Sequence, residues 1–132
     1  MSESRPVPER VESAPAERIY HLTTRGEWAA ATAAGAYRFS ARGRTLEEVG
    51  FVHCGHREQV LQVAERIYAD MAELVLLVID PARLGSPLRK ENLEGGTELY
   101  PHIYGPLLLA AVTKALPMRR QSSGPFRLPP DL

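Results

Sequence analysis

The most regular pattern in the chain is a helical repeat of apolar positions followed by an aliphatic run. Between residues 56 and 71, apolar side chains recur every three or four positions, which predicts the longest helix of the protein. Residues 73–79 are almost all Leu, Val and Ile, as is typical of a strand covered on both faces. We therefore expect a central strand with the long helix packed against it. The side chains predicted to lie in the core are Leu74, Leu76, Val78, Val60, Ala64 and Ile67.

Capping and turn residues bound the shorter elements. Residues 18–22 alternate between two faces and predict a short strand. Thr24 followed by Glu27 matches a capping box, and a glycine follows the last alanine, so we expect a helix over residues 25–34. The same signals predict one helical turn at residues 45–50. The remaining expected elements are extended segments at 51–53, 88–91 and 97–104, a short helix at 106–112, and a closing hairpin of 114–120 with 126–128.

Composition divides the chain into a tail and one domain. Residues 1–17 hold three prolines among Ser, Glu and Arg, a composition that buries too little surface to offset its ordering entropy. We expect this segment to be a mobile tail. The full chain has 132 residues, of which 44% are hydrophobic, enough for one core. Residues 18–132 are therefore predicted to form a single α+β domain.

Charge and cysteine content narrow the range of partners. Sixteen basic and sixteen acidic residues give a net charge of zero, without a long run of like charge, so tight nucleic-acid binding is not expected. Cys54 is the single cysteine, which rules out an intramolecular disulfide and is typical of a reducing compartment. The longest apolar run is too short to span a bilayer, and the N-terminus lacks the apolar stretch of a secretory signal. We expect a cytoplasmic protein with no membrane partner.

Three of the four histidines stand where predicted strands end. His21 lies in YHLTT, His53 in GFVHCGH and His102 in ELYPHIYGPL. Rigid scaffolds often present functional side chains at such positions. A single histidine is commonly a structural, hydrogen-bonded residue, but three at equivalent positions favour a shared site. We predict that they border one cleft, with aromatic walls from Tyr100 or Tyr104.

Other residues leave alternative sites open. His53, Cys54 and His56 carry ligand types that suit zinc, although no second cysteine pair or HExxH motif accompanies them. Cys54 with a histidine base is a second possible reactive centre, without a specific nucleophile signature around it. The basic loop of residues 38–44 suits an anionic ligand or an ordinary solvated surface.

Longer segments of the chain resemble a known family. The segments IYHLTT, GFVHCGHREQVLQVAERIY and LYPHIYGPLLLAAV resemble the bacterial family known as domain of unknown function 952, from about Arg18 to Pro129. That family in turn resembles the ADP-ribosyltransferase superfamily, which includes toxins, poly-ADP-ribose polymerases and RNA 2′-phosphotransferases. Its fold is a split pair of small sheets with flanking helices, whose cleft grips NAD. The resemblance implies an α+β fold of this type and NAD as a cofactor.

The same resemblance implies roles for individual residues. By position, His21 would meet a ribose hydroxyl, His53 would lie beside the nicotinamide, and His102 would take the third position, often a glutamate, at the nicotinamide ribose. Cleavage of the nicotinamide bond develops positive charge that a carboxylate stabilises, and His102 carries none. Glu98, four residues earlier, would supply it if the segment is a regular strand. The cofactor contacts implied are His21, Thr23, His53, Tyr100 and Tyr104.

The sequence thus supports one leading hypothesis and two others. The leading one is a domain that binds NAD or a nucleotide-like ligand between the three histidines, with ADP-ribosyl or phosphotransferase chemistry. RNA 2′-phosphotransferases lack the glutamate too, because positioning by basic groups suffices there. The second hypothesis is a non-catalytic ligand-binding or interaction module on the same fold. The third is a metal-dependent enzyme that uses His53, Cys54 and His56.

Overall fold

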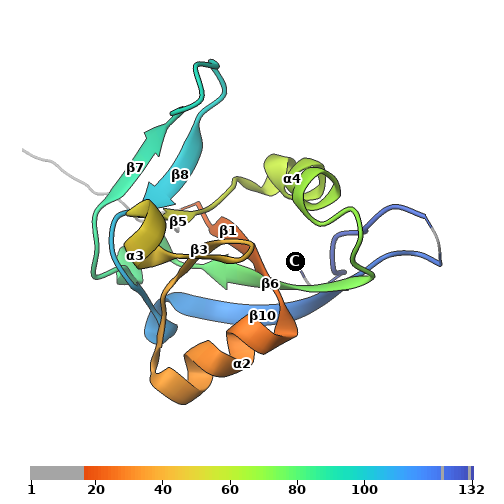
Figure 1. The fold of residues 1–132 in the computed structure, drawn as a ribbon, viewed down its shortest axis with the longest axis horizontal. Helices are drawn as coiled ribbons and strands as arrows, with labels where there is room; N and C mark the ends of the chain where they lie inside the picture. The colour runs from red at the N-terminus through yellow and green to blue at the C-terminus, as the bar shows by residue number, and fades with distance from the viewer. Residues whose placement is uncertain (1–16, 123, 131) are drawn as a thin grey trace, which may run out of the picture.

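A central strand organises the computed structural model, which describes residues 17–122, 124–130 and 132. This strand, β6 (Glu73–Ile79), is flanked on both sides by antiparallel partners, β1 (Ile19–Thr23) and β10 (Val112–Arg119). Every β6 residue after Glu73 is buried. Figure 1 shows β6 between its neighbours, with helices on opposite faces of the sheet. The predicted central strand is confirmed.

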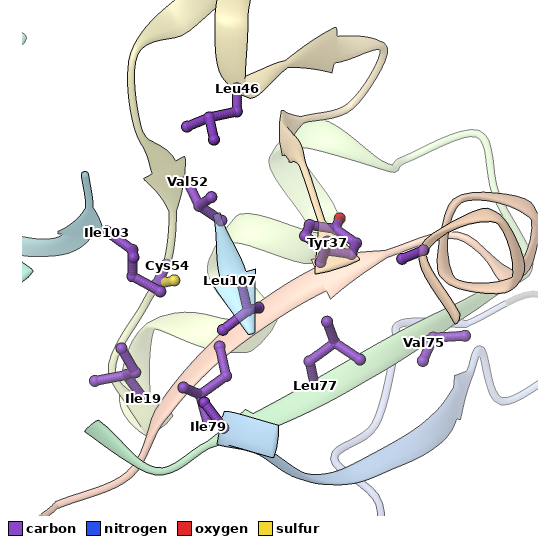
Figure 2. Close-up of a cluster of buried hydrophobic side chains, with 12 residues drawn as sticks. Ile19, Tyr37, Leu46, Val52, Cys54, Val75, Leu77, Ile79, Ile103 and Leu107 are labelled. Carbon is purple, nitrogen blue, oxygen red and sulfur yellow. The ribbon is translucent and has the colours of Figure 1, made fainter. Parts of the chain in front are cut away.

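The two faces of β6 belong to two separate clusters of apolar side chains. Residues 75, 77 and 79 face one cluster and residues 74, 76 and 78 face the other, as the alternation of a strand requires. Figure 2 shows the first cluster, which contains Leu77 together with Tyr37, Val52, Ile103 and Leu107. The second cluster covers the opposite face with Val60, Ala64 and Tyr68, among others. Burial on both faces explains the unbroken aliphatic sequence of the strand.

The long helix is shorter than its sequence pattern predicts. Helix α4 (Val60–Ile67) follows the 3₁₀ turn η1 (Arg57–Gln59), is eight residues long and ends four residues before the pattern does. The cause lies far away in sequence, because the Arg120 guanidinium donates to the backbone oxygens of Tyr68, Ala69 and Met71, at 3.1, 3.0 and, through Nε, 2.7 Å. These carbonyls are satisfied without a helix. The predicted core residue Ile67 is instead 39% exposed, because it stands in the last turn.

Local signals predict the start and end of both other helices, although only α3 forms the complete capping box expected of each. Helix α2 (Arg25–Ala34) begins after Thr24, whose hydroxyl accepts from the Glu27 amide at 3.1 Å, and ends at Gly35 with φ 88°. Helix α3 (Leu46–Val49) has a complete capping box between Thr45 and Glu48. Both ends require left-handed backbone, which glycine adopts without strain. These boundaries are local, so the sequence alone predicts them.

A second sheet carries the segments that contain two of the histidines. Strands β5 (Val52–His53), β8 (Tyr100–Ile103) and β7 (Leu88–Glu91) pair in the order β5-β8-β7. Strand β8 is shorter than the predicted extended segment 97–104, because Asn92 organises the preceding loop. The Asn92 side chain accepts from the amides of Glu94 and Gly96 at 2.8 and 3.0 Å. The β7–β8 hairpin stands out from the body of the molecule (Figure 1).

Two predicted elements near the C-terminus differ from the structure. The expected helix at 106–112 is wrong: the chain forms strand β9 (Leu107–Leu108), paired with β2 (Ala36–Tyr37), and then the 3₁₀ turn η3 (Leu109–Ala111). Leu107 is fully buried in the cluster around Tyr37, and this pairing outweighs local helix preference. In the closing hairpin, β10 is as expected, but the second arm forms no named strand in the described residues and pairs through a bridge between Arg120 and Phe126.

The remaining small elements complete the architecture. Strands β3 (Phe39–Ala41) and β4 (Arg44–Thr45) form a hairpin, and the turn η2 (Pro81–Arg83) follows β6. In the described residues the strands form four small antiparallel sheets with few helices, which confirms the α+β class. Within this part of the chain, no helix is both long and apolar enough to cross a membrane. Residues 1–16 of the predicted tail lie outside the described residues.

Candidate functional site

A pocket of about 240 Å³ opens at the edge of β1. Its walls come from β1, β3, β5, α4, β8 and the turn that follows β7. His21, His53 and His102 all line it, together with aromatic and aliphatic side chains. The three histidines therefore border one pocket, as expected from the sequence.

Strand pairing brings these histidines together. His53 and His102 are directly opposite in the pairing of β5 with β8, and their ring centroids lie 5.0 Å apart. Strand β1 reaches the same place through a bridge between Tyr20 and Gly55, whose two backbone hydrogen bonds measure 2.9 and 2.7 Å. The site thus depends on contacts between β1, β5 and β8, which are distant in sequence.

His102 is held by a carboxylate from the neighbouring strand. Its Nδ1 lies 2.8 Å from Oε2 of Glu91, and its ring stacks on Phe51 with centroids 4.2 Å apart. The same Glu91 oxygen accepts a hydrogen bond from the Tyr104 hydroxyl. The hydroxyl of Tyr104 and the ring of His102 hold the pKa of the Glu91 carboxyl below its usual value. Glu91 is therefore an ionised acceptor at neutral pH.

His53 presents an uncharged ring to the pocket. Burial, and secondarily the proximity of His102, lower the pKa of His53, so its imidazole is neutral at pH 7. The ring packs edge-on against Phe51, with centroids 4.7 Å apart. Among the described residues, neither ring nitrogen of His53 has a hydrogen-bond partner. Both nitrogens are thus available to a ligand.

His21 has a different environment, because both of its nitrogens already have protein partners. Nδ1 bonds to the backbone oxygen of His53, and Nε2 lies 2.7 Å from the Tyr37 hydroxyl. The chain of contacts continues from Tyr37 to Thr23 at 2.8 Å and from Thr23 to Glu27 at 3.0 Å. Burial lowers the pKa of His21 to about 4. The contact through Nδ1 ties the His21 ring to the backbone that carries His53.

Comparison with known proteins identifies the family. Residues 22–115 match the family described as "Protein of unknown function (DUF952)". The chain belongs to this family. Its fold is similar to the crystal structure of protein CC0527 from Caulobacter crescentus, with a TM-score of 0.72 and 34% identity over 84% of this chain and 94% of that one. The solution NMR structure of CC0527 matches with a TM-score of 0.68 and 34% identity over 83% and 90%. No curated protein matches the chain significantly.

Several residues predicted for the site lie elsewhere in this DUF952 chain. Tyr100 lines the pocket, but Tyr104 and Thr23 do not. Thr23 is fully buried in the hydrogen-bond chain of His21.

Glu98 is also outside the lining of the pocket. It accepts hydrogen bonds from Gln59 at 3.0 Å and from the Tyr100 hydroxyl at 3.1 Å. The expectation that Glu98 shares a strand face with His102 is not met, because β8 begins only at residue 100.

The alternatives built on Cys54 find little support in the DUF952 fold. In the described residues, no group of three His, Cys, Asp or Glu side chains could hold a metal ion. His56 caps η1 and lies outside the pocket lining, which separates it from His53. The Cys54 sulfur packs among Ile103 and Leu107 (Figure 2), and burial raises the pKa of its thiol strongly. A buried, protonated thiol is a poor nucleophile and a poor metal ligand.

The structure adds residues that the sequence pattern did not identify. Glu91 is the partner of His102, and only the pairing register of β7 with β8 shows this.

The basic loop of residues 38–44 is largely neutralised, because Arg42 forms two hydrogen bonds to Asp70, at 2.6 and 2.8 Å, and stands 5.2 Å from the Tyr68 ring. Arg66 is exposed on the pocket lining and has no ion-pair partner within the described part of the chain.

Proposed function

We propose that the pocket binds a nucleotide-like small molecule, with NAD as the first candidate. The observation that carries this proposal is the convergence of three histidines from separate strands on one pocket. Tyr20, Tyr68 and Tyr100 also border that pocket, and aromatic rings are suited to stacking on a nucleobase or nicotinamide. A concave site with aromatic walls and a few convergent polar groups is the usual form of a ligand site. The resemblance to ADP-ribosyltransferases makes NAD the ligand to test first.

The size and charge of the pocket suggest how such a ligand lies. Its volume of about 240 Å³ is below the range of roughly 300–1,000 Å³ that drug-sized ligands occupy. One nucleoside-sized part fits inside, and the rest of a dinucleotide must extend through the mouth. Arg66 borders the pocket and can meet a phosphate there. The neutral ring of His53 can hydrogen-bond to a hydroxyl or a carboxamide inside.

Two kinds of chemistry remain compatible with this pose. ADP-ribosyl transfer needs negative charge near the ribose, and the carboxylate on the pocket lining is Glu94, rather than the expected Glu98. Phosphotransferase chemistry needs mainly positioning by basic groups. A non-catalytic binding module is the second candidate function. It is favoured by Glu98, which lies outside the pocket lining and accepts a hydrogen bond from Gln59.

Calorimetry with the full-length chain tests ligand binding. We would titrate NAD, ADP-ribose, nicotinamide and AMP into the wild type, His53→Ala and the control His56→Ala, which changes a histidine outside the lining. His53→Ala should weaken binding by about 1–3 kcal/mol, because a ligand group loses its partner. His56→Ala should bind as the wild type does. If no compound binds, or if both variants bind equally, the proposed site is wrong.

A turnover assay separates the two candidate functions. Wild-type protein incubated with NAD would be assayed by chromatography for released nicotinamide. Release above the rate of a His53→Ala sample supports transferase-type chemistry. NAD binding without release of nicotinamide supports the non-catalytic module.

A further inference from the structure

We infer that Glu91 positions His102 so that Nε2 of this histidine accepts a hydrogen bond from a neutral donor group of the ligand. This inference rests on the proposed function for the ligand, but its structural part stands without it. Glu91 lies on β7, and His102 lies on the neighbouring strand β8 and lines the pocket. Nothing in the sequence pattern around Glu91 indicates this role.

The first step concerns which nitrogen of His102 carries the proton. Nδ1 lies 2.8 Å from Oε2 of Glu91, which is within normal hydrogen-bond distance. An ionised carboxylate only accepts, so Nδ1 must donate. In the neutral form of the ring, which has a single N–H, Nε2 is then left with its lone pair. Carboxylate partners fix histidine tautomers in the same way at other functional sites.

The second step is that Glu91 is itself held in place. The Tyr104 hydroxyl donates to the same carboxylate oxygen, and the Arg89 guanidinium stands 4.6 Å from the Tyr104 ring. Arg89 is directly opposite His102 in the pairing of β7 with β8, and Glu91 lies two residues further along the same face of β7. Neighbouring strands thus place the carboxylate beside the imidazole.

The third step is the direction in which Nε2 is exposed. His102 is 4% exposed and lines the pocket, and Phe51 stacks on one face of its ring, 4.2 Å between centroids. His53 stands edge-on, 5.0 Å away. Among the described residues Nε2 has no hydrogen-bond partner. A ligand in the pocket is therefore the group that can donate a hydrogen bond to Nε2.

The chemical class of the ligand group follows from these steps. Two imidazoles line the pocket, and Nε2 is the nitrogen of His102 that Glu91 leaves unpaired, so a ligand hydroxyl or amide N–H is favoured as its donor. A carboxylate at the same place would meet a lone pair and lose its hydration without compensation. A ribose hydroxyl and the nicotinamide carboxamide both meet this requirement. Nicotinic acid and a dideoxyribose do not.

The tautomer of His102 is measured directly with ¹⁵N-labelled full-length protein near pH 7.5, from the long-range imidazole correlations of each nitrogen. We expect a proton on Nδ1 and a bare Nε2 in the wild type. Glu91→Gln should keep this tautomer because its amide oxygen still accepts, whereas Glu91→Ala should give a mixture. Lys90→Ala, an exposed change on the same strand, is the control and should leave the spectrum unchanged. A wild-type His102 with a proton on Nε2, or an unaltered tautomer in Glu91→Ala, overturns the inference.

Matched probes then test the ligand class. By calorimetry, nicotinamide should bind about 2- to 10-fold more tightly than nicotinic acid, or AMP more tightly than 2′,3′-dideoxy-AMP by a similar factor. Glu91→Ala should remove the preference, and Glu91→Gln should retain it. Equal binding within both pairs overturns the donor assignment. If none of the four probes binds, the proposed function fails, while the tautomer measurement still decides the role of Glu91.

Discussion

Lowering the pH from 7 to 5 should destabilise the protein by about 2 kcal/mol through His21 alone. His21 is 4% exposed, and burial lowers its pKa from the ordinary value of 6.5 to about 4. In the unfolded chain, His21 is therefore protonated below about pH 6.5. In the folded protein it stays neutral down to about pH 4. Because the unfolded state binds more protons in this window, stability falls as the pH falls.

The magnitude follows from the width of that window. Each pKa unit corresponds to about 1.4 kcal/mol, and about one and a half units of the window lie between pH 7 and pH 5. The lowered pKa of His53 contributes in the same direction. Carboxyl groups such as Asp70, whose pKa is held at about 2 by the side chain of Arg42, contribute only at lower pH.

Urea denaturation at both pH values would measure this difference, with Trp28 fluorescence as the signal. The variant His21→Gln is the control, because an amide occupies the same place without titrating. It should be less stable than the wild type at pH 7, yet lose about 2 kcal/mol less on acidification. If the two proteins lose the same stability between pH 7 and pH 5, His21 is not a buried neutral imidazole.

Three further predictions follow from burial and hydrogen bonding. Leu76→Ala should cost about 2–5 kcal/mol because the side chain is fully buried, whereas Ile67→Ala, at 39% exposed, should cost less than about 1 kcal/mol; urea denaturation of both variants checks the contrast. Tyr37→Phe should cost about 1–3 kcal/mol and shift the ¹⁵N resonances of His21, and an unchanged His21 spectrum would contradict the hydrogen-bond chain. Cys54 should react with a thiol reagent only after unfolding, so rapid labelling of the native protein would refute its burial.

The capping residues show which features of the fold are accessible from sequence. Thr45 and Glu48 form their capping box within one turn, and Gly50 ends the turn, so all the partners lie within a few residues of each other. The aliphatic run of β6 is equally informative, because burial on both faces demands apolar residues at every position. The three histidines were also visible as candidates and do line one pocket, but the expectation that each ends a strand is wrong for His21, which is the middle residue of β1.

Features that depend on distant partners were predicted less well. The pattern of residues 56–71 favours one long helix, but Arg120 binds the carbonyls that follow Ile67 and the helix ends there. The segment after Pro106 suits a helix by local preference, yet its pairing with β2 makes it extended. In each case one long-range interaction outweighs the small free-energy differences of local propensity.

The candidate site shows the same division between local and long-range information. The sequence by itself determined the α+β class, the central strand, both helix caps and the three histidines, since each depends on residue type and periodicity. Only the tertiary structure decided that Glu91, rather than Glu98, reaches His102, because the β7–β8 register sets which carboxylate is near. It also decided that His21 binds Tyr37 and the His53 backbone. These partners lie on neighbouring strands, and the strand register that brings them together is not recorded in the local pattern around either residue.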